Sequence, residues 1–306
     1  MAIIYVNIPI MKPKVIVILG PTATGKSDVA IEIAKKIGGE IISADSRQVY
    51  KGMDLGSGKI TKTEMNGIEH YLLNVVSPNT NFSVVKYKTL AEKAIKNILS
   101  KSKIPIICGG TGFYIDSIVK NIDLPKVKLN KKLRNKLEKL TKEKLFEMLE
   151  KLSPARAQTI DKHNKVRLIR AIEIARQLGG VPQIMEKPAK YNFIFIGLDD
   201  TDEILKNKIY KRLIKRIDLG MISEIKKLHD NGVSWKRLES FGLEYKQTAL
   251  FLQNKITKDQ MIENLKNDIW HFVKRQRTWF KRNKKIKWFK PKKNKQIVKE
   301  IKNSFK

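Results

Sequence analysis

The strongest constraint on the fold is a segment bordered by glycines that directly follows a short apolar run. Residues 15–19 have the β-branched composition of a buried strand, and residues 27–37 carry apolar side chains at helical spacing. Between them, the segment GPTATGKS satisfies the phosphate-loop pattern GxxxxGK[ST] in the strand-to-helix context that this pattern requires. Its members are Gly20, Pro21, Thr22, Ala23, Thr24, Gly25, Lys26 and Ser27. The sequence therefore predicts a loop that surrounds a phosphate group at a helix N-terminus.

The side chains of this loop suit a phosphate ligand. Lys26 supplies a positive charge, the hydroxyls of Thr22 and Thr24 are candidate hydrogen-bond donors, and the Ser27 hydroxyl is a candidate ligand of Mg²⁺. The motif alone leaves open whether the anion is a nucleoside triphosphate such as ATP or another diphosphate.

The chain alternates short apolar runs with helical patterns on both sides of a purely helical middle. The runs at 41–42, 104–108 and 193–198 are further candidate strands. We therefore expect an α/β fold: a parallel sheet of P-loop NTPase type, flanked by helices, with a helical insertion and a helical C-terminal region. Ligands of such sheets bind at the carboxyl ends of the strands, where Asp45 and the Gly109-Gly110 turn are expected.

Three parts of the chain differ in pattern. Residues 125–190 lack strand signals and have leucines at helical spacing among many lysines. We predict a P-loop core with C-terminal helices at 11–124 and 191–285, a helical insertion domain at 125–190 and a basic tail at 286–306. The fold is expected to start near Met11, because the decapeptide before it has no recognisable pattern.

The charge balance points to a polyanionic partner. Sixty-three Lys and Arg against 30 Asp and Glu give a net charge of +33, which favours binding to nucleic acid. Because 51 of these residues are lysines, a bias in codon usage is the alternative explanation. The single cysteine and four scattered histidines exclude disulfide and zinc scaffolds, and no apolar run approaches the roughly 20 residues of a membrane helix. We expect a cytoplasmic protein without a membrane partner.

Four further motifs carry a resemblance to a known family. They are DSRQVYKGMDLG at 45–56, GGTGFY at 109–114, NKVRLIRAIE at 164–173 and KRQRTWF at 274–280. Together with the loop at 20–27, they make residues 14–289 similar to the tRNA dimethylallyltransferases (isopentenyl-tRNA transferases). The resemblance implies transfer of a dimethylallyl group from dimethylallyl diphosphate to N6 of adenosine 37 of tRNA, next to the anticodon. The products would be N6-isopentenyladenosine and diphosphate.

The resemblance also implies roles for single residues. Asp45 would be the general base, Thr111 would lie beside the reacting adenine, and Arg216 would clamp the diphosphate together with Arg212 on the same helix face. Mg²⁺ on Ser27 is the expected cofactor, and a monomer binding the anticodon arm of tRNA is the expected complex. The expected tRNA contacts are Asp45, Ser46, Arg47, Gln48, Val166, Arg167, Leu168, Ile169 and Arg170, with residues 274–282 as further candidates.

Each role has a structural alternative. Asp45 and Thr111 could merely shape turns, and the two arginines could belong to a solvated helix face. At the level of function, a small-molecule P-loop kinase would use Asp45 to activate a hydroxyl group. An adenylate dimethylallyltransferase would need neither the insertion nor the basic end, and a non-catalytic RNA-binding module would need neither the phosphate loop nor the carboxylate.

Overall fold

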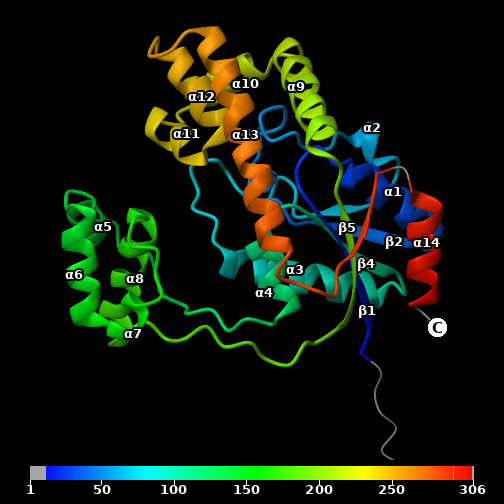
Figure 1. Ribbon diagram of the computed structural model, residues 1–306, viewed down its shortest axis with the longest axis horizontal. Helices are drawn as coiled ribbons and strands as arrows, with labels where there is room; N and C mark the ends of the chain where they lie inside the picture. The colour runs from blue at the N-terminus through cyan, green and yellow to red at the C-terminus, as the bar shows by residue number, and fades with distance from the viewer. Residues whose placement is uncertain (1–11, 292, 305–306) are drawn as a thin grey trace, which may run out of the picture. The chain divides into compact units, whose positions relative to one another are not determined.

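The computed structural model describes residues 12–291 and 293–304, and its centre is a parallel β-sheet (Figure 1). The six strands of the described residues lie in the order β3-β2-β4-β1-β5-β6, and all neighbouring pairs are parallel. Their bounds are β1 Lys14–Leu19, β2 Gly39–Ser43, β3 His70–Tyr71, β4 Ile104–Gly109, β5 Asn192–Leu198 and β6 Lys287–Phe289. The predicted α/β class is confirmed. The expected start of the fold at Met11 lies outside the described residues.

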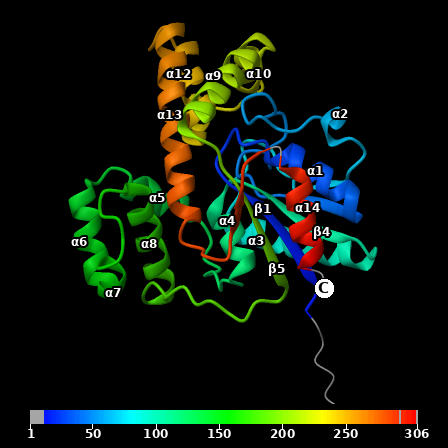
Figure 2. The same ribbon diagram turned by 45° about the vertical axis from the view of Figure 1, so that its right-hand side comes forward.

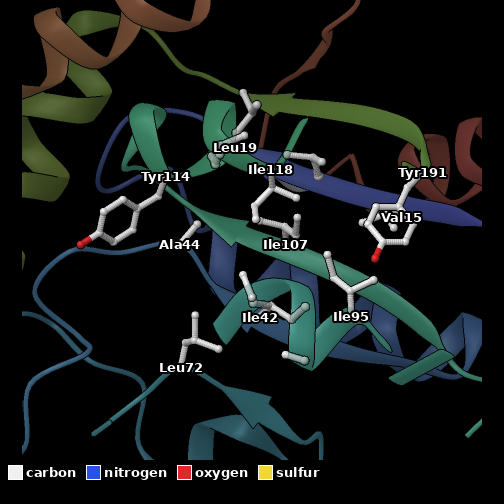
Figure 3. Close-up of a cluster of buried hydrophobic side chains, with 14 of the residues drawn as sticks. Val15, Leu19, Ile42, Ala44, Leu72, Ile95, Ile107, Tyr114, Ile118 and Tyr191 are labelled. Carbon is white, nitrogen blue, oxygen red and sulfur yellow. The ribbon is translucent and has the colours of Figure 1, made fainter. Parts of the chain in front are cut away.

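Helices cover both faces of this sheet: α1 (Lys26–Ile37) and α14 (Asn294–Asn303) on one, α3 (Val84–Ser100) and α4 (Gly112–Val119) on the other. Successive side chains of a strand point to opposite faces. Ile16 and Ile18 are therefore buried with α1, whereas Val15 and Val17 are buried with α3 and α4. Figure 3 shows this second cluster, in which Tyr114 lies at the end nearer the loops that follow the strands. Within the described residues, no helix is both long and apolar enough to cross a membrane.

A third hydrophobic cluster holds the C-terminal helices to the segment that follows β2. These helices are α9 Asp202–Asp218, α10 Met221–Asp230, α11 Trp235–Phe241, α12 Leu243–Leu252 and α13 Lys258–Phe280. Val49, Tyr50 and Met53 are buried among them, and a short helix, α2 (Lys62–Met65), follows the same segment. This packing places side chains of α9, α12 and α13 near the loops after the strands.

A second compact unit comprises Lys120–Pro188. It contains α5 Lys131–Leu137, α6 Lys142–Leu152, α7 Pro154–Ala157 and α8 Lys165–Leu178. Its own core gathers Leu145, Leu149 and Leu168. The predicted insertion at 125–190 has the same helical character, but the unit starts five residues earlier and ends two residues earlier, because Asp123 pairs with Met185 in a short bridge.

The described residues of the basic tail predicted at 286–306 are instead part of the folded core. Strand β6 pairs with β5, and α14 lies against α1, as both views show (Figures 1 and 2). Ile297 and Ile301, four residues apart on one face of α14, are fully buried in the cluster of α1. This apolar face is narrow and is surrounded by lysines, so the composition of the segment did not indicate a packed helix.

Candidate active site

The phosphate loop adopts a turn that its glycines make possible. Gly20, just after β1, has φ +141°, and a Cβ there would lie 2.1 Å from the main-chain oxygen of Leu198. Gly25 is left-handed, with φ 74°, where α1 begins. A side chain at Gly20 would therefore clash with the backbone of the neighbouring strand. The predicted strand, loop and helix all occur in the expected order.

Two side chains of the loop bond to the loop itself. The fully buried Thr24 donates from its hydroxyl to Pro21 O at 2.9 Å, and Lys26 Nζ donates to the same oxygen at 2.5 Å. The Thr24 hydroxyl thus shapes the turn, which differs from its expected use as a phosphate donor.

Burial lowers the pKa of the Lys26 ammonium to about 8. The neighbouring Arg212 lowers this pKa further, whereas Cys108, Asp45 and Asp199 act to raise it. The ammonium is therefore poorly solvated and is poised to accept a negatively charged partner.

A cavity of about 120 Å³ lies beside this loop, where the strands end. It is lined by Thr22, Ala23, Asp45, Ser46, Arg47, Gly56, Ser57, Thr111, Ile209, Arg212, Arg216, Gly242, Leu243, Glu244, Tyr245, Ile269 and Phe272. The structure thus brings the predicted base, Asp45, together with Thr111 and Arg216, whereas Lys26 and Ser27 do not line the cavity. A larger hollow of about 700 Å³ lies at the opposite edge of the sheet, but none of the motif residues line it.

Asp45 belongs to a turn that two hydrogen bonds close. Its Oδ1 accepts from the main-chain N–H of Arg47 at 2.8 Å and of Gln48 at 3.4 Å. Thr111 fixes the same turn, because its Oγ1 accepts from the N–H of Ser46 at 3.0 Å. Both residues therefore have the structural role that was the alternative, and both also face the cavity.

The glycines of the GGTG turn allow three close approaches. A Cβ at Gly109 would lie 2.3 Å from Ala44 O, one at Gly110 would lie 2.2 Å from Gln276 Nε2, and one at Gly112 would meet the Trp279 ring at 2.2 Å. The turn is therefore tightly enclosed by the loop after β2 and by the end of α13.

The two arginines of α9 differ in their partners. Arg216 donates to Glu244 Oε1 at 2.6 Å and to the main-chain oxygens of Leu55 and Gly56 at 3.2 and 3.3 Å. The guanidinium of Arg212 makes no hydrogen bond or ion pair with any residue that the structure describes. Burial lowers the pKa of Arg212, and the nearby charge of Arg216 adds to this shift. Arg212 is thus the freer cation for an anionic ligand, and Arg216 is already paired.

Sequence reasoning missed two side chains that support the site. Glu224 accepts three main-chain N–H bonds, from Asp54 and Leu55 through Oε2 and from Gly56 through Oε1, at 2.6–3.0 Å. Gln276 contacts two loops at once. No local signal reveals Glu224, because it lies about 170 positions from its partners, whereas Gln276 belongs to the KRQRTWF motif.

Two acidic residues after β5, Asp199 and Asp202, form ion pairs with one arginine, Arg277. Arg277 donates to Asp199 Oδ1 at 2.9 Å and to Asp202 Oδ1 at 2.5 Å. Among residues 12–291 and 293–304, no cluster of three or more His, Cys, Asp and Glu side chains could hold a metal. The exposed hydroxyl of Ser27 has no hydrogen-bond partner within this part of the chain, so it fits a Mg²⁺ ion whose other ligands are phosphate oxygens and water.

The expected tRNA contacts fall into two groups. Ser46 and Arg47 line the cavity, whereas Gln48 accepts from Ser43 Oγ at 3.1 Å. In the second unit, Val166 is 73% exposed and Arg167 is also exposed.

The remaining three residues of the second group turn inward. Leu168 and Ile169 are buried in the core of the second unit, and Arg170 pairs with the fully buried Glu173 at 2.5 Å. Helical periodicity directs the side chains of Leu168 and Ile169 into the core, so these side chains are not available to RNA. The tRNA contact of this segment stays a prediction.

Comparisons with known proteins agree with this arrangement. A family model described as IPP transferase matches residues 48–283. A tRNA dimethylallyltransferase of Acetivibrio thermocellus is 40% identical over 283 residues, which cover 90% of each chain. Another, from Treponema denticola, is 43% identical over 277 residues and covers 88% of this chain and 92% of its own.

Two solved structures share the fold. The tRNA isopentenylpyrophosphate transferase of Bacillus halodurans superposes with a TM-score of 0.73 at 33% identity, over 95% of this chain and 96% of that one. A eukaryotic dimethylallyltransferase described as acting on tRNA gives a TM-score of 0.76 at 25% identity, over 96% of this chain and 77% of that one. The predicted resemblance and the predicted fold class are confirmed. This chain belongs to the IPP transferase family, the family of the tRNA dimethylallyltransferases.

Proposed function

We propose that this protein transfers a dimethylallyl group from dimethylallyl diphosphate to N6 of adenosine 37 in tRNA. The observation that carries the proposal is the cavity beside the phosphate loop, which is lined by the carboxylate of Asp45 and by the guanidinium of Arg212, a cation without an ion-pair partner among the described residues. A prenyl donor needs cationic and amide groups around its diphosphate, and an adenine nucleophile needs a nearby base. Membership of the family supports the same reaction.

The reaction breaks the C1–O bond of the donor and forms a bond between C1 and N6 of the adenine. The electron pair of the C1–O bond leaves with diphosphate, and the proton of N6 goes to the carboxylate of Asp45. Lys26, Arg212 and the loop amides stabilise the negative charge that grows on the leaving group. For this, the Lys26 ammonium exchanges its bond to Pro21 O for a phosphate oxygen.

Ser27 would hold Mg²⁺ against the diphosphate, where the ion would neutralise part of the leaving-group charge. Asp28, the next residue in the chain, is also exposed and adds an acidic side chain to the first turn of α1. The chain's own cations remain the groups that orient the donor.

The tRNA would place its anticodon arm on this protein and extrude adenosine 37 into the cavity. The partly buried Arg47 and the exposed Val166 and Arg167 are the candidates for contacts with flanking nucleotides. We expect the complex to contain one copy of the chain, to form in the cytoplasm and to need no membrane.

The test is mass spectrometry of nucleosides from tRNA incubated with the protein, dimethylallyl diphosphate and Mg²⁺. We expect N6-isopentenyladenosine at position 37 and release of diphosphate. Parallel reactions contain AMP in place of tRNA, or ATP in place of the prenyl donor. Prenylated AMP would favour an adenylate-modifying enzyme, and ATP-dependent phosphorylation of a nucleoside would favour a kinase.

A further inference from the structure

The amide side chain of Gln276, on α13, connects the phosphate loop after β1 with the GGTG turn after β4. Its Oε1 accepts a hydrogen bond from the main-chain N–H of Thr22 at 2.9 Å, and its Nε2 donates to Gly110 O at 3.0 Å. The residue is 5% exposed, so water does not compete effectively for either bond. One side chain thus satisfies a donor after β1 and an acceptor after β4.

From Gly110, the connection continues to the predicted base. Thr111 donates its main-chain N–H to Ala44 O at 3.0 Å, and its Oγ1 accepts from the N–H of Ser46 at 3.0 Å. These two bonds hold the residues on either side of Asp45. A displacement of Gly110 would therefore move the carboxylate of Asp45 relative to the phosphate loop.

The surroundings leave this amide little freedom. A Cβ at Gly110 would come within 2.2 Å of Gln276 Nε2, and Gly110 does not have a positive φ. Gly110 is thus needed for the space that Gln276 fills rather than for its backbone conformation. The next residue, Arg277, anchors the same turn of α13 to Asp199 after β5.

We propose that Gln276 is a positioning residue that sets the distance between the phosphate loop and Asp45. The inference rests on the proposed function, because only a reaction between two bound substrates needs this distance. An amide suits the task because a single planar group both donates and accepts. A misplacement of about 1 Å between reacting groups costs roughly 10²-fold in rate.

The first test replaces Gln276 by methionine, which has a similar size and neither hydrogen-bonding group. In Gln276→Met, we expect kcat to fall about 10²-fold, while KM for dimethylallyl diphosphate and for tRNA stays unchanged. The matched control is Gln247→Met on α12. Gln247 is similarly buried, at 6% exposure, and bonds Asp268 of α13 at 2.7 Å, but it bonds neither the phosphate loop nor the turn at Gly110. The control should keep its kcat even if its melting temperature falls as far.

A second test reaches the same contact from the opposite side and does not depend on the stability of the first variant. Gly110→Ala should displace the amide and lower kcat by a similar factor. In the background of Gln276→Ala, where that space is vacated, Gly110→Ala should cause little further loss. Full additivity of the two losses would contradict the proposed connection.

Other outcomes would also overturn the inference. These are a wild-type kcat in Gln276→Met, an equal loss in Gln247→Met, or an effect confined to KM of the donor, which would assign the amide to donor binding. The absence of product with the wild-type protein would overturn the proposed function itself, so the two failures are distinguishable.

Discussion

Replacing Asp45 by asparagine separates its two roles. Asparagine keeps an Oδ1 that can accept the bonds from the N–H groups of Arg47 and Gln48, so the turn should persist. It lacks the carboxylate that would take the N6 proton. We therefore expect Asp45→Asn to lower the rate of prenyl transfer by roughly 10²–10⁴-fold with tRNA affinity nearly unchanged.

The alanine variant of Asp45 measures how much the turn contributes to the stability of the fold. Asp45→Ala removes both bonds of the turn, at 2.8 and 3.4 Å, which should lower the free energy of unfolding by about 1–2 kcal/mol. For a chain of this size, that corresponds to a melting temperature lower by roughly 2–6 °C. Asp45→Asn should melt close to the wild-type protein.

Three measurements on both variants complete this test: single-turnover product formation by nucleoside mass spectrometry, thermal unfolding, and tRNA binding by fluorescence anisotropy. A wild-type rate in Asp45→Asn would remove Asp45 from the role of general base. If Asp45→Asn lost as much stability as Asp45→Ala, its loss of activity would no longer separate the chemistry from the fold.

Three more predictions concern charged side chains. Because burial lowers the pKa of Lys26 to about 8, kcat/KM for the donor should fall as the pH rises through about 8, where the free enzyme loses this positive charge. Lys26→Arg should move this fall to higher pH, and a flat wild-type profile would contradict the prediction. Glu244→Gln removes the anion paired with Arg216 at 2.6 Å, so the variant should melt at a lower temperature. Calorimetry should show that it binds pyrophosphate about 10–100-fold more tightly, because Arg216 is then free for the ligand. An unchanged affinity would refute competition between Glu244 and the ligand. Truncation of α14 would expose buried isoleucines, so the contribution of its charge to tRNA binding is better tested by neutralising its exposed lysines. Their loss should flatten the dependence of log tRNA affinity on log salt by roughly 0.7–0.9 per lost phosphate contact. An unchanged slope would favour codon bias as the source of these lysines. These lysines are Lys295, Lys299 and Lys302.

The sequence alone was sufficient for the features that short segments determine. The phosphate loop could be predicted because Gly20, Gly25 and Lys26 are close in the chain, and the turn they form needs only its adjacent strand and helix. The parallel sheet followed from alternating apolar runs, and Asp45 could be placed at its edge because the carboxyl ends of parallel strands meet there. The order of the motifs was sufficient for the family.

The tertiary structure alone decided how the charges and polar groups pair. Arg216 and Glu244 lie 28 positions apart, Glu224 and the loop at 54–56 about 170, and Gln276 and Thr22 254. No local pattern encodes such pairs, because they form only when packed helices bring distant side chains into contact. For the same reason, the lysine-rich end could not be recognised as a strand and a packed helix from its composition. The sequence shows which residues carry a charge, but the packing of the helices determines which residues they pair with.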